Sequence, residues 1–262
     1  RLALSIDGEE TDWSNPDAPV TVSIPYTPTA AELENPGSIV VWYIDGSGNV
    51  VTIPNGRYDP AAGTVTFSTT HFSGYAVAYN KVSFSDVADT AWYSGAVNFI
   101  AAREITAGTG GGTYSPNATP TRGEFIVLMM RAYGISPDED PADNFSDAGD
   151  TWYTGYLAAA KRRGIASGVG DNMYAPGNEI TRQEMLTLLY RTLSVLGELP
   201  AGTSGKTLSD FADGGSVAPY AQEAMTLLVE TGIVSGSGGE LFPAGTTTRA
   251  EMAQVLYNLL GK

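Results

Sequence analysis

The tetrapeptide Thr-Arg-x-Glu occurs three times in this 262-residue chain, each time ahead of an apolar stretch with helical periodicity. The arginines of the three copies are Arg122, Arg182 and Arg249, which are 60 and then 67 residues apart. A guanidinium is a rigid fork of donors that binds a carboxylate through parallel hydrogen bonds. The spacing therefore predicts three similar units, each with one candidate anion site.

The threonine and glutamate of each copy form a helix-capping pattern. In a capping box the threonine hydroxyl accepts from the backbone N–H three residues on, and the glutamate reaches back to the threonine N–H. Each cap contributes about 1 kcal/mol to helix stability. We therefore expect a structural role for Thr121, Glu124, Thr181, Glu184, Thr248 and Glu251.

The arginine needs a different explanation, because a cation at the first helical position faces the positive end of the helix dipole. One explanation is a structural ion pair with a neighbouring aspartate, such as Asp86, Asp147 or Asp210. The other is that the guanidinium and the free N–H groups of the helix N-terminus together bind a carboxylate. The sequence leaves both explanations open.

Each Thr-Arg-x-Glu closes the same series of shorter motifs. The first copy has Phe84-Ser85-Asp86, a helical stretch, a Gly-x-Gly loop and Tyr114-Ser115-Pro116. The second copy opens at Phe145-Ser146-Asp147, and we align the third opening with Leu208-Ser209-Asp210. Polar, turn-rich linkers separate the copies. The series predicts a β domain at 1–80 and repeats at 81–140, 141–203 and 204–262.

Further candidate ligand contacts lie in the loops and at the helix starts. The glycines permit positive φ and close approach of a ligand, or they form ordinary turns. Trp92 and Trp152 are either sugar-stacking rings or core anchors of the first helix. The opening aspartates either accept hydrogen bonds from ligand hydroxyls or cap the helix that follows. The candidate glycines are Gly108, Gly110, Gly168, Gly170, Gly236 and Gly238.

Composition argues against several kinds of chemistry. The net charge of −15 argues against nucleic acid and anionic membranes as partners. The absence of cysteine excludes thiolate metal sites, and a single histidine, His71, excludes multi-histidine metal sites. We expect no catalytic residues, no metal, no cofactor and no membrane insertion. The start at Arg1 indicates a fragment or mature product, and the composition is compatible with secretion.

The region before the repeats has a strand pattern and predicts a small β-sandwich-like domain. Its alternating or β-branched runs, separated by turn sequences, lie at 20–24, 39–44, 50–53, 64–68 and 75–79. His71-Phe72-Ser73 is similar to the last-strand motif of autoproteolytic domains, in which a histidine activates the nucleophile. A histidine at a strand end is the simpler interpretation.

The series of motifs resembles the S-layer homology domain, a module that occurs in threes at an end of Gram-positive cell-surface proteins. The resemblance covers about 81–262 and rests on the Phe-x-Asp openings, the tryptophans, Gly-x-Gly, aromatic-x-Pro and Thr-Arg-x-Glu. The third copy departs from it, with Leu208 at the opening and no tryptophan near Val217. The resemblance implies a mostly α-helical trimeric arrangement with pseudo-threefold symmetry. Its inter-repeat grooves are implied to bind the pyruvylated N-acetylmannosamine end of a secondary cell-wall polysaccharide.

We therefore expect a multidomain chain of α and β structure that serves as an extracellular, noncovalent anchor on a cell wall. The expected anion contacts are Arg122, Arg182 and Arg249, and each groove is expected to combine the aspartate and tryptophan of one copy with the Gly-x-Gly and arginine of a neighbour. A second hypothesis is self-association in a surface lattice without sugar binding. A third places an enzyme in a missing N-terminal region.

Overall fold

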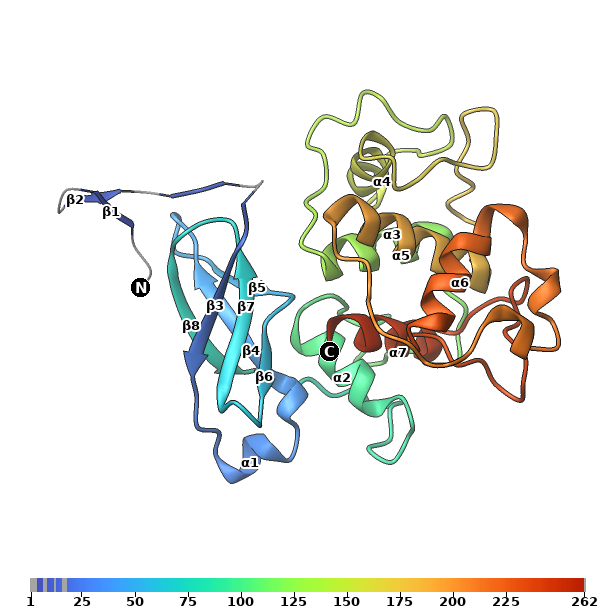
Figure 1. Cartoon of the computed structure of the whole chain (residues 1–262). Helices are drawn as coiled ribbons and strands as arrows, with labels where there is room; N and C mark the ends of the chain where they lie inside the picture. The colour runs from blue at the N-terminus through green and yellow to red at the C-terminus, as the bar shows by residue number, and fades with distance from the viewer. Residues whose placement is uncertain (1–3, 7–8, 12, 16–17, 262) are drawn as a thin grey trace. The chain divides into compact units, whose positions relative to one another are not determined.

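The computed structural model describes residues 4–6, 9–11, 13–15 and 18–261 of the chain. These residues form two compact units (Figure 1). The first unit runs to Tyr114 and also includes 132–134 and Gly261, whereas the second comprises 115–131 and 135–260. The first repeat is therefore divided between the units, with its first helix in one and its second helix in the other.

The first unit contains the predicted β region. Its described strands pair antiparallel in the orders β1-β2, β3-β7-β6 and β5-β4-β8. A short helix and a 3-10 turn, α1 (Ala30–Leu33) and η1 (Pro36–Ser38), precede the central strand β4. The strands are β1 (Leu4–Ile6), β2 (Glu9–Thr11), β3 (Val20–Pro25), β4 (Ile39–Ile44), β5 (Val50–Ile53), β6 (Arg57–Asp59), β7 (Thr64–Thr69) and β8 (Gly74–Tyr79).

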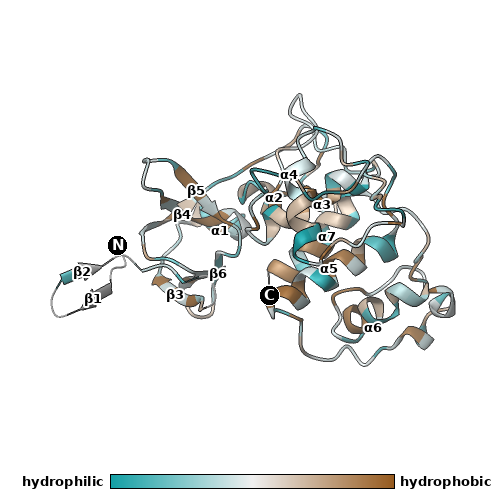
Figure 2. Ribbon diagram, turned by 90° about the horizontal axis from the view of Figure 1, so that it is seen from above, coloured by the Kyte–Doolittle hydropathy of each residue, from teal (hydrophilic) through white to brown (hydrophobic). Residues whose placement is uncertain are grey.

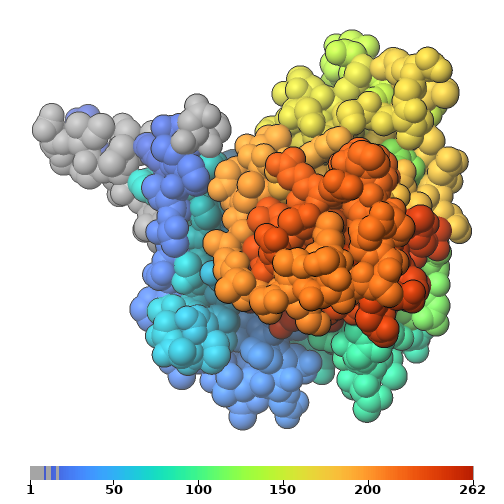
Figure 3. Space-filling model, turned by 45° about the vertical axis from the view of Figure 1, so that its right-hand side comes forward, coloured from blue at the N-terminus to red at the C-terminus, as the bar shows by residue number. Residues whose placement is uncertain are grey.

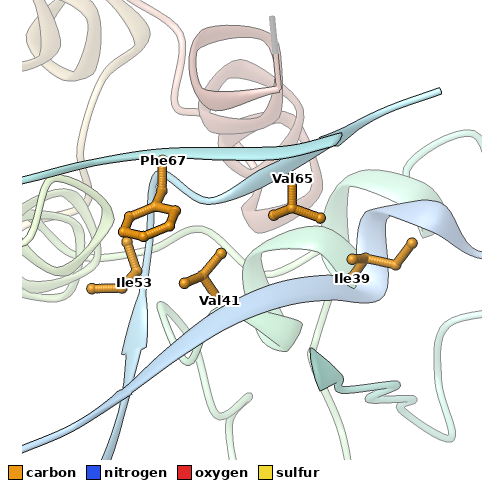
Figure 4. Packing of buried hydrophobic residues seen from close by; sticks show 5 residues of the cluster. All are labelled: Ile39, Val41, Ile53, Val65 and Phe67. Atoms are coloured by element: carbon orange, nitrogen blue, oxygen red, sulfur yellow. The ribbon is translucent and has the colours of Figure 1, made fainter. Parts of the chain in front are cut away.

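Both three-stranded sheets contribute to one hydrophobic core (Figure 4). Ile39 and Val41 come from β4, Ile53 from β5, and Val65 and Phe67 from β7. Alternate residues of β7 are buried, as the two-residue period of a strand requires. The predicted strands are confirmed, and β1, β2 and β6 are additions, because three residues are too few to show a period.

Arg103 links helix α2 (Ser94–Ala102), the first helix of the first repeat, to the β region by hydrogen bonds. Arg103 is 3% exposed, and its guanidinium lies 3.5 Å from the centroid of the Phe99 ring. A buried cation needs several acceptors to offset its lost hydration. The guanidinium donates to the carbonyl oxygens of Gly37, Ile39, Gly56 and Phe99 at 2.6, 3.3, 2.6 and 3.1 Å.

The residue that follows Arg103 is strained. Glu104 has a φ of +58°, whereas Gly164 and Gly232 occupy the same position after α4 and α6, with φ of +73° and +74°. A residue with a Cβ costs about 1 kcal/mol or more in this left-handed region. The Glu104 carboxylate accepts a hydrogen bond from the Thr52 hydroxyl of β5 at 3.0 Å. The first repeat therefore keeps a residue that binds the β region where the other repeats have glycine.

Helices dominate the second unit, and hydrophobic and hydrophilic residues alternate along them in Figure 2. Each Thr-Arg-x-Glu begins a helix with the predicted capping box. The threonine N–H lies 2.8, 2.9 and 2.8 Å from the glutamate carboxylate in the three copies. The helices are α3 (Arg122–Ala132), α4 (Thr154–Arg162), α5 (Arg182–Leu196), α6 (Gln222–Glu230) and α7 (Arg249–Leu260), with 3-10 turns η2 (Leu208–Asp210), η3 (Gly214–Ser216) and η4 (Pro219–Ala221).

Backbone hydrogen bonds link α3, α5 and α7 in a closed cycle. The first two N–H groups of each helix donate to the proline-containing loop of the next repeat, and the third repeat returns to the first. Each of these bonds is 2.8 to 3.0 Å long. The donor and acceptor pairs are Arg122 to Asn178, Gly123 to Pro176, Arg182 to Gly245, Gln183 to Pro243, Arg249 to Ala118 and Ala250 to Pro116.

The residue before each threonine connects this cycle a second time. Pro120, Ile180 and Thr247 are all buried. The Ile180 N–H donates to the Pro120 carbonyl at 3.1 Å, and the Thr247 N–H donates to the Ile180 carbonyl at 3.4 Å. A third bond of this kind would need an N–H from Pro120, which proline lacks.

The third repeat opens three residues later than predicted. Phe211, and not Leu208, takes the place of Phe84 and Phe145, because all three phenylalanines are buried against the first glycine of their Gly-x-Gly loop. Leu208-Ser209-Asp210 instead forms η2. The alignment on Leu208 is wrong because it relies on the shared Ser-Asp dipeptide rather than on the number of residues between the opening and the Gly-x-Gly loop. Residues of this repeat, orange to red, gather in one region of the surface in Figure 3.

Candidate functional site

Arg122, at the start of α3, reaches from the first repeat into the second. Its Nε donates to the Tyr174 carbonyl at 2.9 Å, and its Nη1 donates to Glu184 Oε1 at 2.6 Å. The guanidinium also lies over the Tyr174 ring, 4.5 Å from the centroid. Of the two explanations left open for this arginine, the structure shows an ion pair, but its partner is the capping-box glutamate of the next repeat and not one of the opening aspartates.

A cavity of about 420 Å³ adjoins Arg122 in the second unit. This volume lies within the roughly 300–1,000 Å³ that is typical of small-molecule sites. Apolar walls and a few convergent polar groups are also typical of such sites. The cavity is lined by Arg122 of the first repeat, by Ser167, Gly168, Val169, Tyr174, Glu184, Thr187, Leu188 and Arg191 of the second, and by Tyr220 of the third.

The charged groups that line the cavity are two guanidiniums and one carboxylate. Arg191 was not among the candidates from the sequence, although it stands nine residues after Arg182, as Arg131 does after Arg122. Partial burial and the nearby Glu184 carboxylate raise the pKa of Tyr220, and burial raises the pKa of Tyr174. Both phenols therefore stay neutral over the physiological range and add no charge to the cavity.

The helix N-termini offer no free donors to a ligand in the three Thr-Arg-x-Glu helices. The first two N–H groups of each helix donate to the next repeat, and the third is capped by the threonine hydroxyl at 3.2, 3.4 and 3.2 Å. The prediction that free N–H groups complete an anion pocket is therefore wrong. These helix N-termini therefore do not supply the donors for an anion.

The opening aspartates hold the loop that precedes each second helix. Asp86 accepts the Tyr114 N–H at 2.8 Å, and Asp147 accepts the N–H groups of Tyr174 and Ala175 at 2.8 and 2.7 Å. Neither of the predicted alternatives, helix capping or a ligand contact, anticipated these loop bonds. Residues Ser115, Ala175 and Phe242 of these loops have φ between +53° and +58°. A carboxylate that accepts both N–H groups stabilises this left-handed conformation.

The aspartate of the third repeat is Asp213 and not Asp210. Asp213 accepts the N–H groups of Leu241 and Phe242, each at 2.7 Å. Asp210 instead caps η2, where it accepts the Thr207 N–H at 2.7 Å. The missed signal is the separation between the aspartate and the first loop N–H, which is 28, 27 and 28 residues in the three repeats.

The Gly-x-Gly loops are tight turns. A Cβ on Gly168 would lie 2.3 Å from the Met173 carbonyl oxygen and 2.8 Å from Phe145 Cε1, so only glycine fits there. Gly170 begins a short antiparallel bridge to Met173. Gly168 also lines the cavity, and the cavity lining does not include Gly170. Gly108 and Gly236 have the same close contacts in their own repeats, and Gly110 and Gly238 also have positive φ.

Both tryptophans lie on the surface and precede their helices. Trp92 is 64% and Trp152 is 60% exposed, so the interpretation as core anchors is wrong. Each ring packs edge-on against the tyrosine that follows it, with centroids 5.3 and 5.5 Å apart. Tyr220, which is 52% exposed ahead of α6, occupies the comparable place in the third repeat and lines the cavity.

Arg182 repeats the arrangement of Arg122 in a looser form. Its Nη1 lies 3.6 Å from Glu251 Oε1, and its buried Nε has no hydrogen-bond partner among the described residues. Burial lowers the pKa of Arg182, and the Glu251 carboxylate opposes that shift. Arg249, in the third repeat, is 5% exposed.

The β region contains one further polar cluster. His71 Nδ1 lies 3.0 Å from Ser73 Oγ and 3.3 Å from the Tyr75 hydroxyl, beside strand β8. Over the described ranges, no group of three or more His, Cys, Asp or Glu side chains could hold a metal ion. None of the helices described above is long and apolar enough to cross a membrane.

The S-layer homology domain matches residues 83–126, 144–186 and 210–253. This chain belongs to the S-layer homology family. The third match begins one residue before Phe211, as the first begins one residue before Phe84, in agreement with the corrected alignment. Members of this family are anchoring modules, and the chain is accordingly a cell-surface, cell-wall anchoring module.

Relatives of the chain include enzymes and surface-layer proteins. The amylopullulanase of Thermoanaerobacterium thermosulfurigenes is 34% identical over 235 residues, which is 88% of this chain and 12% of the relative. The exoglucanase XynX of Acetivibrio thermocellus is 33% identical over 71% of this chain and 17% of the relative. The S-layer protein sap of Bacillus anthracis is 29% identical over 74% of this chain and 23% of the relative. The chain thus spans less than a quarter of each of these proteins.

Proposed function

We propose that this chain holds a larger surface protein on the cell wall by binding pyruvylated secondary cell-wall polysaccharide noncovalently. The observation that supports this most directly is the cavity beside Arg122, which brings together side chains of three repeats. Its walls combine apolar surface with hydroxyl and guanidinium donors. A sugar that carries a carboxylate presents complementary groups, an apolar ring face, hydroxyls and one anion.

The closed cycle of hydrogen bonds between α3, α5 and α7 supports a pseudo-threefold arrangement of the repeats. In such an arrangement Arg182 and Arg249 mark sites related to the one at Arg122. The contacts of one saccharide unit are weak, but two or three sites on one polymer gain from the high effective concentration of the linked units.

The larger protein is a separate question. Two of the relatives are named for carbohydrate-degrading activities and one for the surface layer, so modules of this kind are joined to different partners. For this chain we propose binding alone, with no catalytic step. The relative of the surface-layer class favours a second candidate function, self-association in a lattice.

The test of the proposed function is cosedimentation of the full chain with purified cell walls. Walls that carry pyruvyl groups are compared with the same walls after mild acid has removed those groups. The expected result is that the chain sediments with the first and stays in solution with the second. Equal sedimentation with both would contradict the role of the pyruvyl carboxylate.

A pair of surface variants locates the binding. Val169 is 55% exposed and lines the cavity, whereas Val195 is 47% exposed on α5 and is not part of the lining. Val169→Glu places a negative charge at the cavity and should weaken cosedimentation, because like charges repel. Val195→Glu adds the same charge elsewhere and should leave it unchanged. Equal effects of the two substitutions would contradict binding at this cavity.

A further inference from the structure

We propose that Arg191 is the residue that binds the anionic group in this cavity, and that Arg122 is a positioning residue for the cavity wall. The inference rests on the proposed function and assigns the ligand's charge to one side chain. It also differs from the expectation from the sequence, in which the arginine of Thr-Arg-x-Glu makes that contact.

Arg122 has little capacity left for a ligand. The residue is 6% exposed, its Nε and Nη1 are engaged by Tyr174 and Glu184, and one face of the guanidinium lies on the Tyr174 ring. Glu184 is committed as well, since Oε1 accepts from Arg122 while Oε2 accepts from the backbone N–H and the hydroxyl of Thr181. The pair therefore forms a neutral, fixed wall between two repeats.

Arg122 and Glu184 neutralise each other, so the positive charge of Arg191 remains uncompensated in the cavity. Arg191 lines the cavity from α5, and its Nη1 donates to the Ser167 hydroxyl at 2.7 Å. Among the described residues no carboxylate forms an ion pair with it. Two guanidiniums and one carboxylate give the lining a net charge of +1. A ligand group with one negative charge, such as the carboxylate of a pyruvyl ketal, would neutralise it.

The contact with Ser167 adds a second donor to the same place. Because the guanidinium donates to the Ser167 oxygen, the hydroxyl proton of Ser167 is free to turn toward a ligand oxygen. The first repeat also has an arginine, Arg131, at the position of Arg191, but the third repeat differs. Asn258 of α7 is nine residues after Arg249, and its amide donates to the Ile233 carbonyl at 3.0 Å. The third repeat therefore has no cation at this position, so the related sites are not equivalent.

The experiment is a binding measurement with a synthetic pyruvyl-ketal N-acetylmannosamine and its methyl ester, in which a methyl group replaces the negative charge. The amide resonances of Gly168 and Val169 in the full chain report binding at this cavity, because both residues line it. The wild type should bind the acid more tightly than the ester by about tenfold, which is the size of a charge-assisted hydrogen bond. Arg191→Gln should remove this difference, and Arg191→Lys should restore part of it.

Arg163→Gln is the matched control, since Arg163 is an exposed cation of the second unit that does not line the cavity. It should keep the preference for the acid. If Arg191→Gln also keeps that preference, the assignment to Arg191 is overturned while the proposed function stands. If the wild type shows no shift of either resonance with the acid or with the pyruvylated polymer, both proposals fail.

Discussion

At the scale of single residues, the sequence predicts contacts that are close along the chain. The capping boxes involve residues three apart, so Thr181 and Glu184 could be assigned from spacing alone. The partner of Arg122 could not, because Glu184 is 62 residues away and belongs to another repeat. Arg191 was missed for the same reason, since nothing local to it indicates that α3 and the third repeat lie nearby.

Asp213 provides a residue-scale prediction. Asp213→Asn should lower the free energy of unfolding by about 1–2 kcal/mol, because an amide can accept only one of the two loop N–H groups that the carboxylate accepts now. Asp210→Asn is the control and should have the smaller effect, since Asp210 caps only the short turn η2. Urea unfolding of the full chain measures both. A larger loss for Asp210→Asn would restore the original alignment of the third repeat.

At the scale of elements, strands and helices were predicted well where a clear period exists. The runs that became β4 and β7 alternate or are β-branched, and α5 has a capping box and apolar residues at helical spacing. The boundaries of the helices were predicted less accurately. For example, α2 begins at Ser94, two residues after Trp92. The hydrogen bonds by which Arg103 links α2 to the β region were not predictable, since their acceptors are backbone carbonyls and not side chains with a sequence pattern.

A substitution of Arg103 tests this link between α2 and the β region. Arg103→Met keeps the length of the side chain but leaves four carbonyl oxygens without their donor, so unfolding should become easier by about 3 kcal/mol. Arg57→Met, on the exposed end of β6, should change the stability little. Denaturation of the full chain in urea gives both values. Equal free energies of unfolding for the two variants would show that Arg103 does not stabilise the link between α2 and the β region.

The turn after α4 gives a second element-scale prediction. Gly164→Ala should cost about 1 kcal/mol, because Gly164 has a φ of +73° and open space around its Cα, so the cost is conformational alone. Gly177→Ala is the matched control, since that glycine also has open space but no positive φ. A shift in thermal midpoint for the first variant and none for the second is expected. Similar midpoints would argue against the left-handed turn.

At the scale of the whole molecule, the family and the cell-surface role could be read from the repeated motifs, and the three matched segments confirm them. The groove composition could not be read, because it depends on how three repeats come together. Self-association also belongs to this scale. In light scattering at rising concentration without polymer, an anchor should stay a monomer, whereas growth into larger species would favour the lattice function.

The central claim is that the chain recognises the pyruvyl group of a wall polymer. Calorimetric titration of the full chain with purified pyruvylated polymer, beside the same polymer after removal of its pyruvyl groups, tests that claim most directly. We predict saturable binding to the first polymer and at least a tenfold weaker interaction with the second, because the anion contributes a charge-assisted hydrogen bond. Equal affinity for both polymers, or no binding to either, would contradict it.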